Sequence, residues 1–221
     1  MSAPRFSDAL RLDVAAVWDA CRCHPFVAAL GDGTLSPAQL EAWARQDFRF
    51  LDGYARALAR AGSRAPDLGT ATRLVAAAHA TLEGEMALHR GLGEAMGIAP
   101  DELEATMASP VTAAYTGFLL RVAGVATFAE AASALLPCLW SYAEIGADLA
   151  RAGLPTQPLL RRVAVTYADP DFADLASWAR RLVDRLGDGA RARRRDRMRQ
   201  AFGTALDFEC RFWDQAFRAG A

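Results

Sequence analysis

A cysteine within an apolar helical pattern is the first residue that could do chemistry. Cys138 directly follows Pro137, and a proline inside a helix removes a backbone donor and bends the axis. Tyr142 comes four residues later, so the thiol and the phenol share one helical face. The pair has two interpretations: a nucleophile beside a hydroxyl, or two core side chains, since free cysteine is among the most buried residue types.

A carboxylate within an aromatic stripe is the second such feature. Asp47 falls on the same helical face as Phe50, Leu51 and Tyr54. Burying a carboxylate there is costly unless it meets a partner. Asp47 therefore either belongs to a polar site, or lies at the edge of the stripe, where it is solvated or paired with an arginine.

A second carboxylate lies near the C-terminus. Glu209 is flanked at helical spacing by Phe212 and Trp213. A carboxylate among aromatic rings can have a raised pKa, which suits a general acid. The alternative is a glutamate on a helix surface. Cys210 is the next residue, points about 100° away on a helix, and is interpreted as part of the core.

The sequence contains four tyrosines, and any of them could contribute a hydroxyl to a site. Besides Tyr54 and Tyr142, these are Tyr115 and Tyr167. Taken singly, each is more typical of an amphipathic core position whose hydroxyl has a hydrogen-bond partner. Only their combination with the cysteine and the carboxylates would indicate a site.

The elements that must position these residues are helices. Ala, Leu, Arg and Glu fill long stretches and β-branched runs are scarce. Ser36-Pro37 with Gln39 has the pattern of a capping box, and Gly and Pro punctuate the chain. An all-α bundle of long helices with short loops is expected. The predicted helices are 6–20, 37–61, 66–96, a short one from 100, 110–124, 127–152, 158–167, 170–186 and 190–217.

Composition limits the function classes. A chain of 221 residues without a Gly/Ser-rich linker suits a single domain over 1–221. Its net charge of -1 gives no field that would favour nucleic acid or an anionic membrane, and the absence of Lys excludes a lysine Schiff base. The arginine-rich run 191–197 lacks interleaved aromatics, so a solvated helix face or an oligomer contact is favoured.

Cellular location follows from similar arguments. Four cysteines do not form a disulfide framework or a structural zinc pattern. The first 13 residues do not read as a signal peptide, and acidic residues and a proline interrupt the most apolar region, 122–149, so no membrane span is expected. A soluble, cytoplasmic protein is predicted.

Several segments in order resemble the TenA/thiaminase II family, which has a haem-oxygenase-like all-α fold. They are His24-Pro25-Phe26-Val27, Gly31-Asp32-Gly33-Thr34-Leu35, Gln46-Asp47, Glu85-Met86-Ala87-Leu88-His89, Leu135-Leu136-Pro137-Cys138-x-Trp140-x-Tyr142-x-Glu144-x-Gly146 and Glu209-x-x-Phe212-Trp213. The Pro-Cys-x-Trp-x-Tyr segment is quite specific, and the match covers almost the whole chain. Cys138 places the chain in the cysteine-bearing branch of the family.

The resemblance implies an activity and roles for residues. The family hydrolyses aminomethyl-pyrimidine, or thiamin itself, to hydroxymethyl-pyrimidine in thiamin salvage, without a cofactor or metal. By resemblance, Cys138 would be the nucleophile that adds to the ring and Glu209 the acid/base. Asp47 would bind the amino and ring-nitrogen edge. The ring would lie against aromatic residues: Phe50, Tyr115, Tyr142 and Tyr167. A homo-oligomer, commonly a tetramer, is also implied.

Two positions depart from the family pattern. Phe50 stands where many members have a tyrosine, which removes one hydroxyl from the expected site. Val163 stands where many members have a tryptophan. A non-catalytic pyrimidine-binding or regulatory protein that kept the pocket is therefore the main alternative to the enzyme.

Metal ligation is a further alternative. His79 with Glu83, and Glu85 with His89, are spaced four apart on one predicted helix, as in iron or manganese sites. Such a pattern would indicate a metal-dependent oxygenase, which the same fold supports. The same spacing is also common for pairs on a helix surface. Haem attachment through 21–24 lacks the required spacing.

Overall fold

The computed structural model describes residues 5–219, and this part of the chain is helical with no strand. Residues 1–4, which open the segment assessed above for a signal peptide, and residues 220–221 lie outside it. The elements are α1 Phe6–Asp13, α2 Ala15–Arg22, α3 Pro25–Asp32, α4 Pro37–Gly62, α5 Leu68–Ala80, the π-helical turn η1 Thr81–Glu85, α6 Met86–Ala95, α7 Pro100–Glu104, α8 Pro110–Val125, α9 Phe128–Ala152, α10 Pro158–Tyr167, α11 Pro170–Asp188 and α12 Ala192–Phe217.

Local capping sets most of the helix starts. The predicted capping box is present, because Gln39 N donates to Ser36 Oγ at 3.2 Å and Ser36 N donates to Gln39 Oε1 at 3.0 Å. Prolines occupy the first turn of α8, α10 and α11, where a missing N–H costs nothing. These boundaries agree with the sequence prediction within a few residues.

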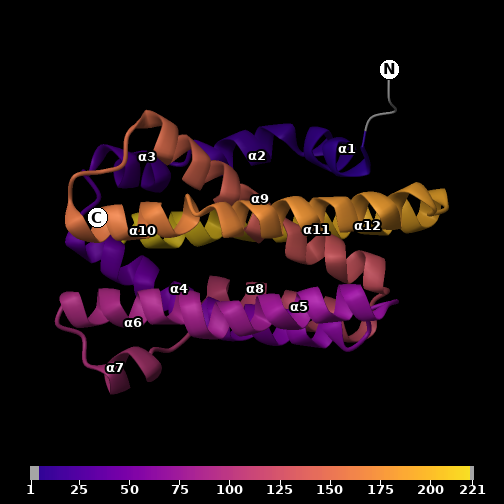
Figure 1. Cartoon of the computed structure of the whole chain (residues 1–221). Coiled ribbons are helices and arrows are strands. Elements are labelled where there is room, and N and C mark those ends of the chain that lie inside the picture. Colours follow the sequence, from indigo (N-terminus) through magenta and orange to yellow (C-terminus); the bar gives the residue numbers. More distant parts are fainter. Residues whose placement is uncertain (1–4, 220–221) are drawn as a thin grey trace.

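The long helices α4, α9 and α12 organise the bundle. In Figure 1, α4, α5, α6 and α8 form a lower layer, while α10, α11 and α12 lie above them with α1, α2 and α3. The central helix α9 crosses the molecule and packs against α10, α11 and α12, as well as α8. The buried side chains of these helices form one hydrophobic core. The multi-helix bundle expected from the sequence is confirmed.

The sequence prediction was wrong at three places. The helix expected over 6–20 is broken at Val14, whose φ of -124° and ψ of 26° leave the helical region. The break expected at His24-Pro25 is present, but a further helix that was not predicted, α3, follows it, because the His24 ring accepts from Phe26 N and caps the helix. The helix expected over 66–96 contains η1, in which Met86 N bonds Thr81 O.

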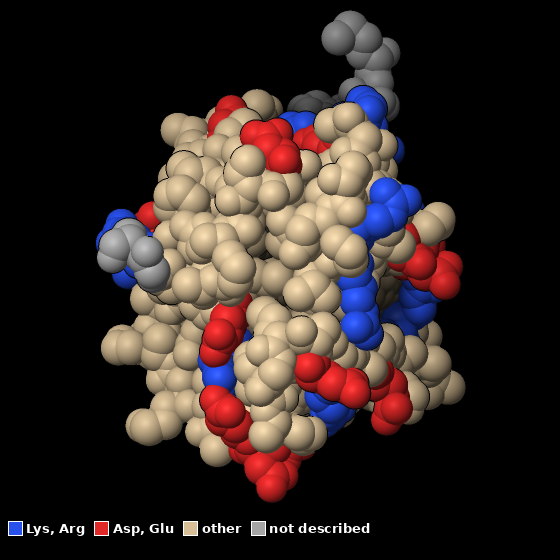
Figure 2. Space-filling model, turned by 90° about the vertical axis from the view of Figure 1, so that its left-hand side faces the viewer, with Lys and Arg blue, Asp and Glu red and all other residues tan. Residues whose placement is uncertain are grey.

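The surface carries both signs of charge. Figure 2 shows acidic and basic side chains side by side on one face, as the net charge of -1 leads one to expect. Within residues 5–219, every helix is either too short or too polar to cross a membrane. In the same part of the chain, no three His, Cys, Asp or Glu side chains come together as a metal-binding group.

Candidate active site

One cavity brings together most of the predicted site residues. It is small, with about 10 Å³ of space for the centre of a water molecule, and lies between α4, η1, α9, α10 and α11. Five of the seven predicted site residues line it, and the other two, Tyr115 and Glu209, lie behind this wall. The lining residues are Asp47, Phe50, Leu51, Tyr54, Glu85, Cys138, Leu139, Tyr142, Tyr167 and Phe172.

The cysteine and the C-terminal glutamate face each other. The Cys138 thiol and the Glu209 carboxylate are close enough to affect each other's pKa, and Glu209 Oε1 accepts from the Tyr115 hydroxyl at 2.6 Å. Burial raises the pKa of Glu209 to about 7, with a further contribution from the charge of Asp47; the bond from Tyr115 opposes the rise. A carboxyl group with this pKa can accept and return a proton near neutral pH.

The thiol itself is neutral at rest. Burial, and then the negative charges of Glu209, Glu85 and Asp47, raise the pKa of Cys138 well above its ordinary value. Cys138 therefore needs a base to become a nucleophile. Glu209 is the carboxylate placed to take that proton.

A tyrosine from α4 holds the turn of α9 that carries the cysteine. The Tyr54 hydroxyl donates to the Leu135 carbonyl at 2.9 Å, two residues before Pro137. Pro137 has no N–H, so the helix ladder is interrupted here. The bond from Tyr54 ties α4 to this interrupted turn and so fixes where Cys138 enters the cavity.

A buried histidine neutralises Asp47. His89 Nε2 lies 2.8 Å from Asp47 Oδ2, and His89 Nδ1 lies 2.8 Å from the Glu85 carbonyl oxygen. Burial disfavours the charged ring, but the hydrogen bond and charge of Asp47 outweigh it and raise the pKa of His89. Both ring nitrogens of His89 thus face protein groups, Asp47 on one side and the Glu85 carbonyl on the other.

Aromatic rings form the remaining walls. Tyr142 meets Tyr167 edge-on at 4.6 Å between ring centroids and stacks on Trp213 at 5.1 Å. Phe50 lies 4.8 Å from the Tyr115 ring and brings no hydroxyl to the cavity. Burial raises the pKa of both Tyr142 and Tyr167 well above 10, so their hydroxyls are neutral hydrogen-bond donors.

A glycine lets α10 approach α9 closely enough to place Tyr167. A Cβ built on Gly146 would lie 2.0 Å from the Tyr167 carbonyl oxygen and 2.2 Å from its carbonyl carbon. No side chain fits there, because both neighbours are backbone atoms. Gly146 therefore sets the distance between the helix that carries Tyr142 and the helix that ends at Tyr167.

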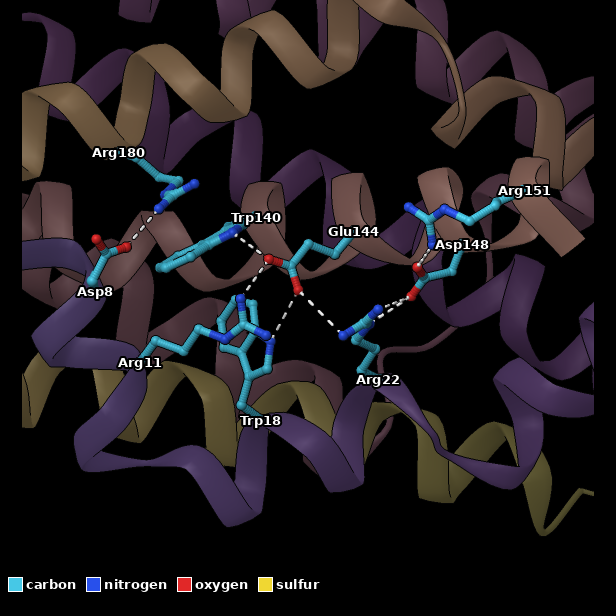
Figure 3. Close-up of polar contacts among 9 residues, drawn as sticks. All are labelled: Asp8, Arg11, Trp18, Arg22, Trp140, Glu144, Asp148, Arg151 and Arg180. Atoms are coloured by element: carbon cyan, nitrogen blue, oxygen red, sulfur yellow. Dashed lines mark hydrogen bonds and ion pairs between the residues drawn. The ribbon is translucent and has the colours of Figure 1, made fainter.

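Glu144 fastens the N-terminal helices to the other face of α9 (Figure 3). Its Oε1 accepts from Trp140 Nε1 at 2.9 Å and from Arg11 at 2.7 Å, and its Oε2 accepts from Trp18 Nε1 at 3.2 Å. Arg180 stacks on the Trp140 ring at 4.1 Å. Glu144, which the family resemblance included, thus has a structural position outside the cavity.

The sequence analysis missed three residues of the site. Tyr54 was placed on the Asp47 face, but no role followed from that. Glu85 and His89 were considered only as metal ligands, whereas the structure places Glu85 in the cavity and His89 against Asp47. The spacing of four residues between Glu85 and His89 is a sequence pattern that indicates a shared helical face. No pattern in the sequence predicts the π-helical turn that ends at Glu85.

Comparison with known proteins identifies the family of the chain. The sequence profile of the TENA/THI-4/PQQC family matches residues 12–219. The chain belongs to the TENA/THI-4/PQQC family. A relative from Halalkalibacterium halodurans, named aminopyrimidine aminohydrolase, is 35% identical over 204 residues, which cover 91% of this chain and 90% of the relative. The resemblance to TenA proteins noted in the sequence is confirmed.

Solved structures of TENA/THI-4/PQQC relatives share the fold. A TenA homologue from P. horikoshii OT3 superposes with a TM-score of 0.89 at 30% identity, covering 98% of this chain and all of its own. A Shewanella denitrificans domain described as having a haem-oxygenase-like fold gives a TM-score of 0.72 at 15% identity, covering 96% of this chain and 91% of that one. This family member therefore has the haem-oxygenase-like fold predicted above.

Proposed function

We propose that this protein is an aminopyrimidine aminohydrolase of the thiaminase II type. It hydrolyses aminomethyl-pyrimidine, or thiamin itself, to hydroxymethyl-pyrimidine in thiamin salvage. The observation that carries the proposal is the proximity of the Cys138 thiol and the Glu209 carboxylate at an aromatic cavity that also contains Asp47. The names of relatives that match over most of their length support the same activity.

The cavity supplies what this reaction needs. In this scheme the side chains of Phe50, Tyr142 and Tyr167 move apart to admit a flat heteroaromatic ring, and the Asp47 carboxyl group accepts from its exocyclic amino group. Glu209 takes the thiol proton, and the Cys138 thiolate adds to the ring. Glu209 then protonates the departing amine and later takes a proton from the attacking water. No step in this scheme calls on a cofactor or metal.

Release of ammonia and hydroxymethyl-pyrimidine from aminomethyl-pyrimidine tests this function. The assay compares wild type, Cys138→Ala and, as a matched control, Cys23→Ala, whose thiol is exposed. Chelator is present throughout. The expected result is turnover by wild type and Cys23→Ala that falls by at least about 1,000-fold in Cys138→Ala.

A pyrimidine-binding or regulatory protein without turnover is the second candidate, favoured by the missing hydroxyl at Phe50. Saturable binding of hydroxymethyl-pyrimidine by wild type without ammonia release would establish that candidate. Turnover by wild type that appears only when the chelator is left out would instead point to the metal-dependent reaction.

We also propose a cytoplasmic homo-oligomer, a tetramer by family resemblance, built from one domain over 1–221. Large apolar side chains left exposed on a single subunit support subunit contacts, and they include Leu12, Leu68, Met107 and Val125. Light scattering after gel filtration measures the oligomeric state. A single mass of one subunit would contradict the oligomer.

A further inference from the structure

Glu85 is the one carboxyl group at the cavity that the proposed function leaves without a role. It ends the π-helical turn η1, and such turns occur often at functional sites. Thr81 Oγ1 donates to Glu85 Oε1 at 3.1 Å, which orients the carboxyl group. Among the residues described, no donor bonds Glu85 Oε2. One oxygen is therefore free for a ligand.

The surroundings of Glu85 in the cavity favour its protonated form, so its pKa is higher than that of an ordinary glutamate. Asp47, Glu85 and Glu209 are three carboxyl groups near one cavity, and His89 is paired with Asp47. Burial raises the pKa of Glu85 to about 7; the charge of Asp47 adds to the rise, while His89 and Thr81 oppose it.

The other titratable groups that face Glu85 are neutral in this range. They have pKa values well above their ordinary ones, and the negative charge of Glu85 contributes to each rise. These groups are Tyr54 on α4, Cys138 on α9 and Tyr167 on α10.

The chemistry of ring addition calls for a proton donor in this position. When a thiolate adds to a ring carbon next to nitrogen, a sulfur–carbon bond forms, the carbon–nitrogen π bond breaks, and its electron pair moves to nitrogen. A neutral ring resists this unless an acid meets that nitrogen. Asp47 is paired with His89, and Glu209 lies beside the thiol. Glu85 is the remaining acid.

We propose that Glu85 is a further catalytic residue, whose protonated carboxyl group binds the ring nitrogen beside the attacked carbon and gives it a proton as Cys138 adds. The electron pair on that nitrogen then expels the amine from the methylene carbon. After water has added, sulfur leaves and the nitrogen proton returns to Glu85. This inference rests on the proposed function.

Ammonia release by Glu85→Gln, against the matched control Glu83→Gln, is the first test. Glu83 lies on the same turn with an exposed side chain. An amide can donate a hydrogen bond but cannot transfer the proton, so kcat/KM is expected to fall by about 100-fold or more in Glu85→Gln and to stay near wild type in Glu83→Gln. Equal activity of the two variants would overturn the inference while leaving the proposed function in place.

A binding measurement separates contact from misfolding. The two ligands are hydroxymethyl-pyrimidine and its pyridine counterpart, in which CH replaces the nitrogen beside the attacked carbon. Wild type is expected to prefer the pyrimidine by about tenfold, the worth of one hydrogen bond, and Glu85→Leu to bind both alike. An unchanged preference in a Glu85→Leu protein with normal circular dichroism would refute the contact. No ammonia release from wild type would overturn the proposed function and the catalytic role together.

Discussion

Replacing Tyr115 by Phe should move the pH dependence of the reaction in a known direction. The Tyr115 hydroxyl donates to Glu209 Oε1 at 2.6 Å inside the core, and this bond lowers the pKa of Glu209 from the value that burial would impose. Phenylalanine keeps the ring contacts with Phe50 and Phe208 but removes the donor. The neutral acid is then favoured, so the pKa of Glu209 rises above about 7.

The size of the shift follows from the strength of the bond. A hydrogen bond to a charged group contributes about 1.5–3 kcal/mol, and one pKa unit corresponds to about 1.4 kcal/mol. Since Glu209 must be ionised to take the proton of Cys138, the acid limb of the kcat/KM profile should move up by about one to two pH units.

Ammonia release measured from pH 5 to 9 tests the predicted shift of the acid limb. Tyr54→Phe is the matched control, because its hydroxyl donates to the neutral Leu135 carbonyl and not to a carboxylate. Its acid limb should stay in place. An acid limb that is identical in wild type and Tyr115→Phe would refute the assignment of that limb to Glu209.

Three further outcomes are expected. Gly146→Ala should lower the free energy of unfolding by about 1–3 kcal/mol in urea and raise KM, since the new methyl group meets the Tyr167 backbone; unchanged values for both would contradict the close approach. The pKa of Glu85 is about 7 in the folded state and about 4.5 in the unfolded state, so the folded state binds more protons between these pH values. The free energy of unfolding should therefore fall by up to about 3 kcal/mol as the pH rises from 4.5 to 7. Glu85→Gln should make this dependence on pH shallower. Glu144→Leu should lower the melting temperature, with a loss of about 1–3 kcal/mol, because two indole N–H groups lose their acceptor.

Helix positions could be predicted from the sequence where a boundary depends on a few neighbouring residues. Ser36 with Gln39, and the prolines that open α10 and α11, satisfy backbone groups locally, so their effect does not depend on the rest of the fold. The π-helical turn η1 is different, because its Thr81–Met86 backbone bond coexists with contacts of Glu85 and His89 to α4. No local pattern encodes those.

The site could be predicted in its residue types and only partly in its contacts. Helical spacing placed Asp47, Phe50 and Tyr54 on one face, and all three line the cavity. That Cys138 meets Glu209, and that a histidine neutralises Asp47, depends on how α4, α6, α9 and α12 pack, which periodicity within one helix does not determine. Catalytic roles remain predictions.

The bonds from Arg11 and Trp18 to Glu144 have a consequence for the folding of the chain during its synthesis. Trp18 and Arg11 leave the ribosome early, but their carboxylate partner lies 126 and 133 residues further along. Until α9 has emerged, α1 and α2 have no acceptor for the Trp18 indole and no surface to cover. The first helices made are therefore among the last to dock, and the nascent protein exposes their apolar faces to chaperones for most of translation.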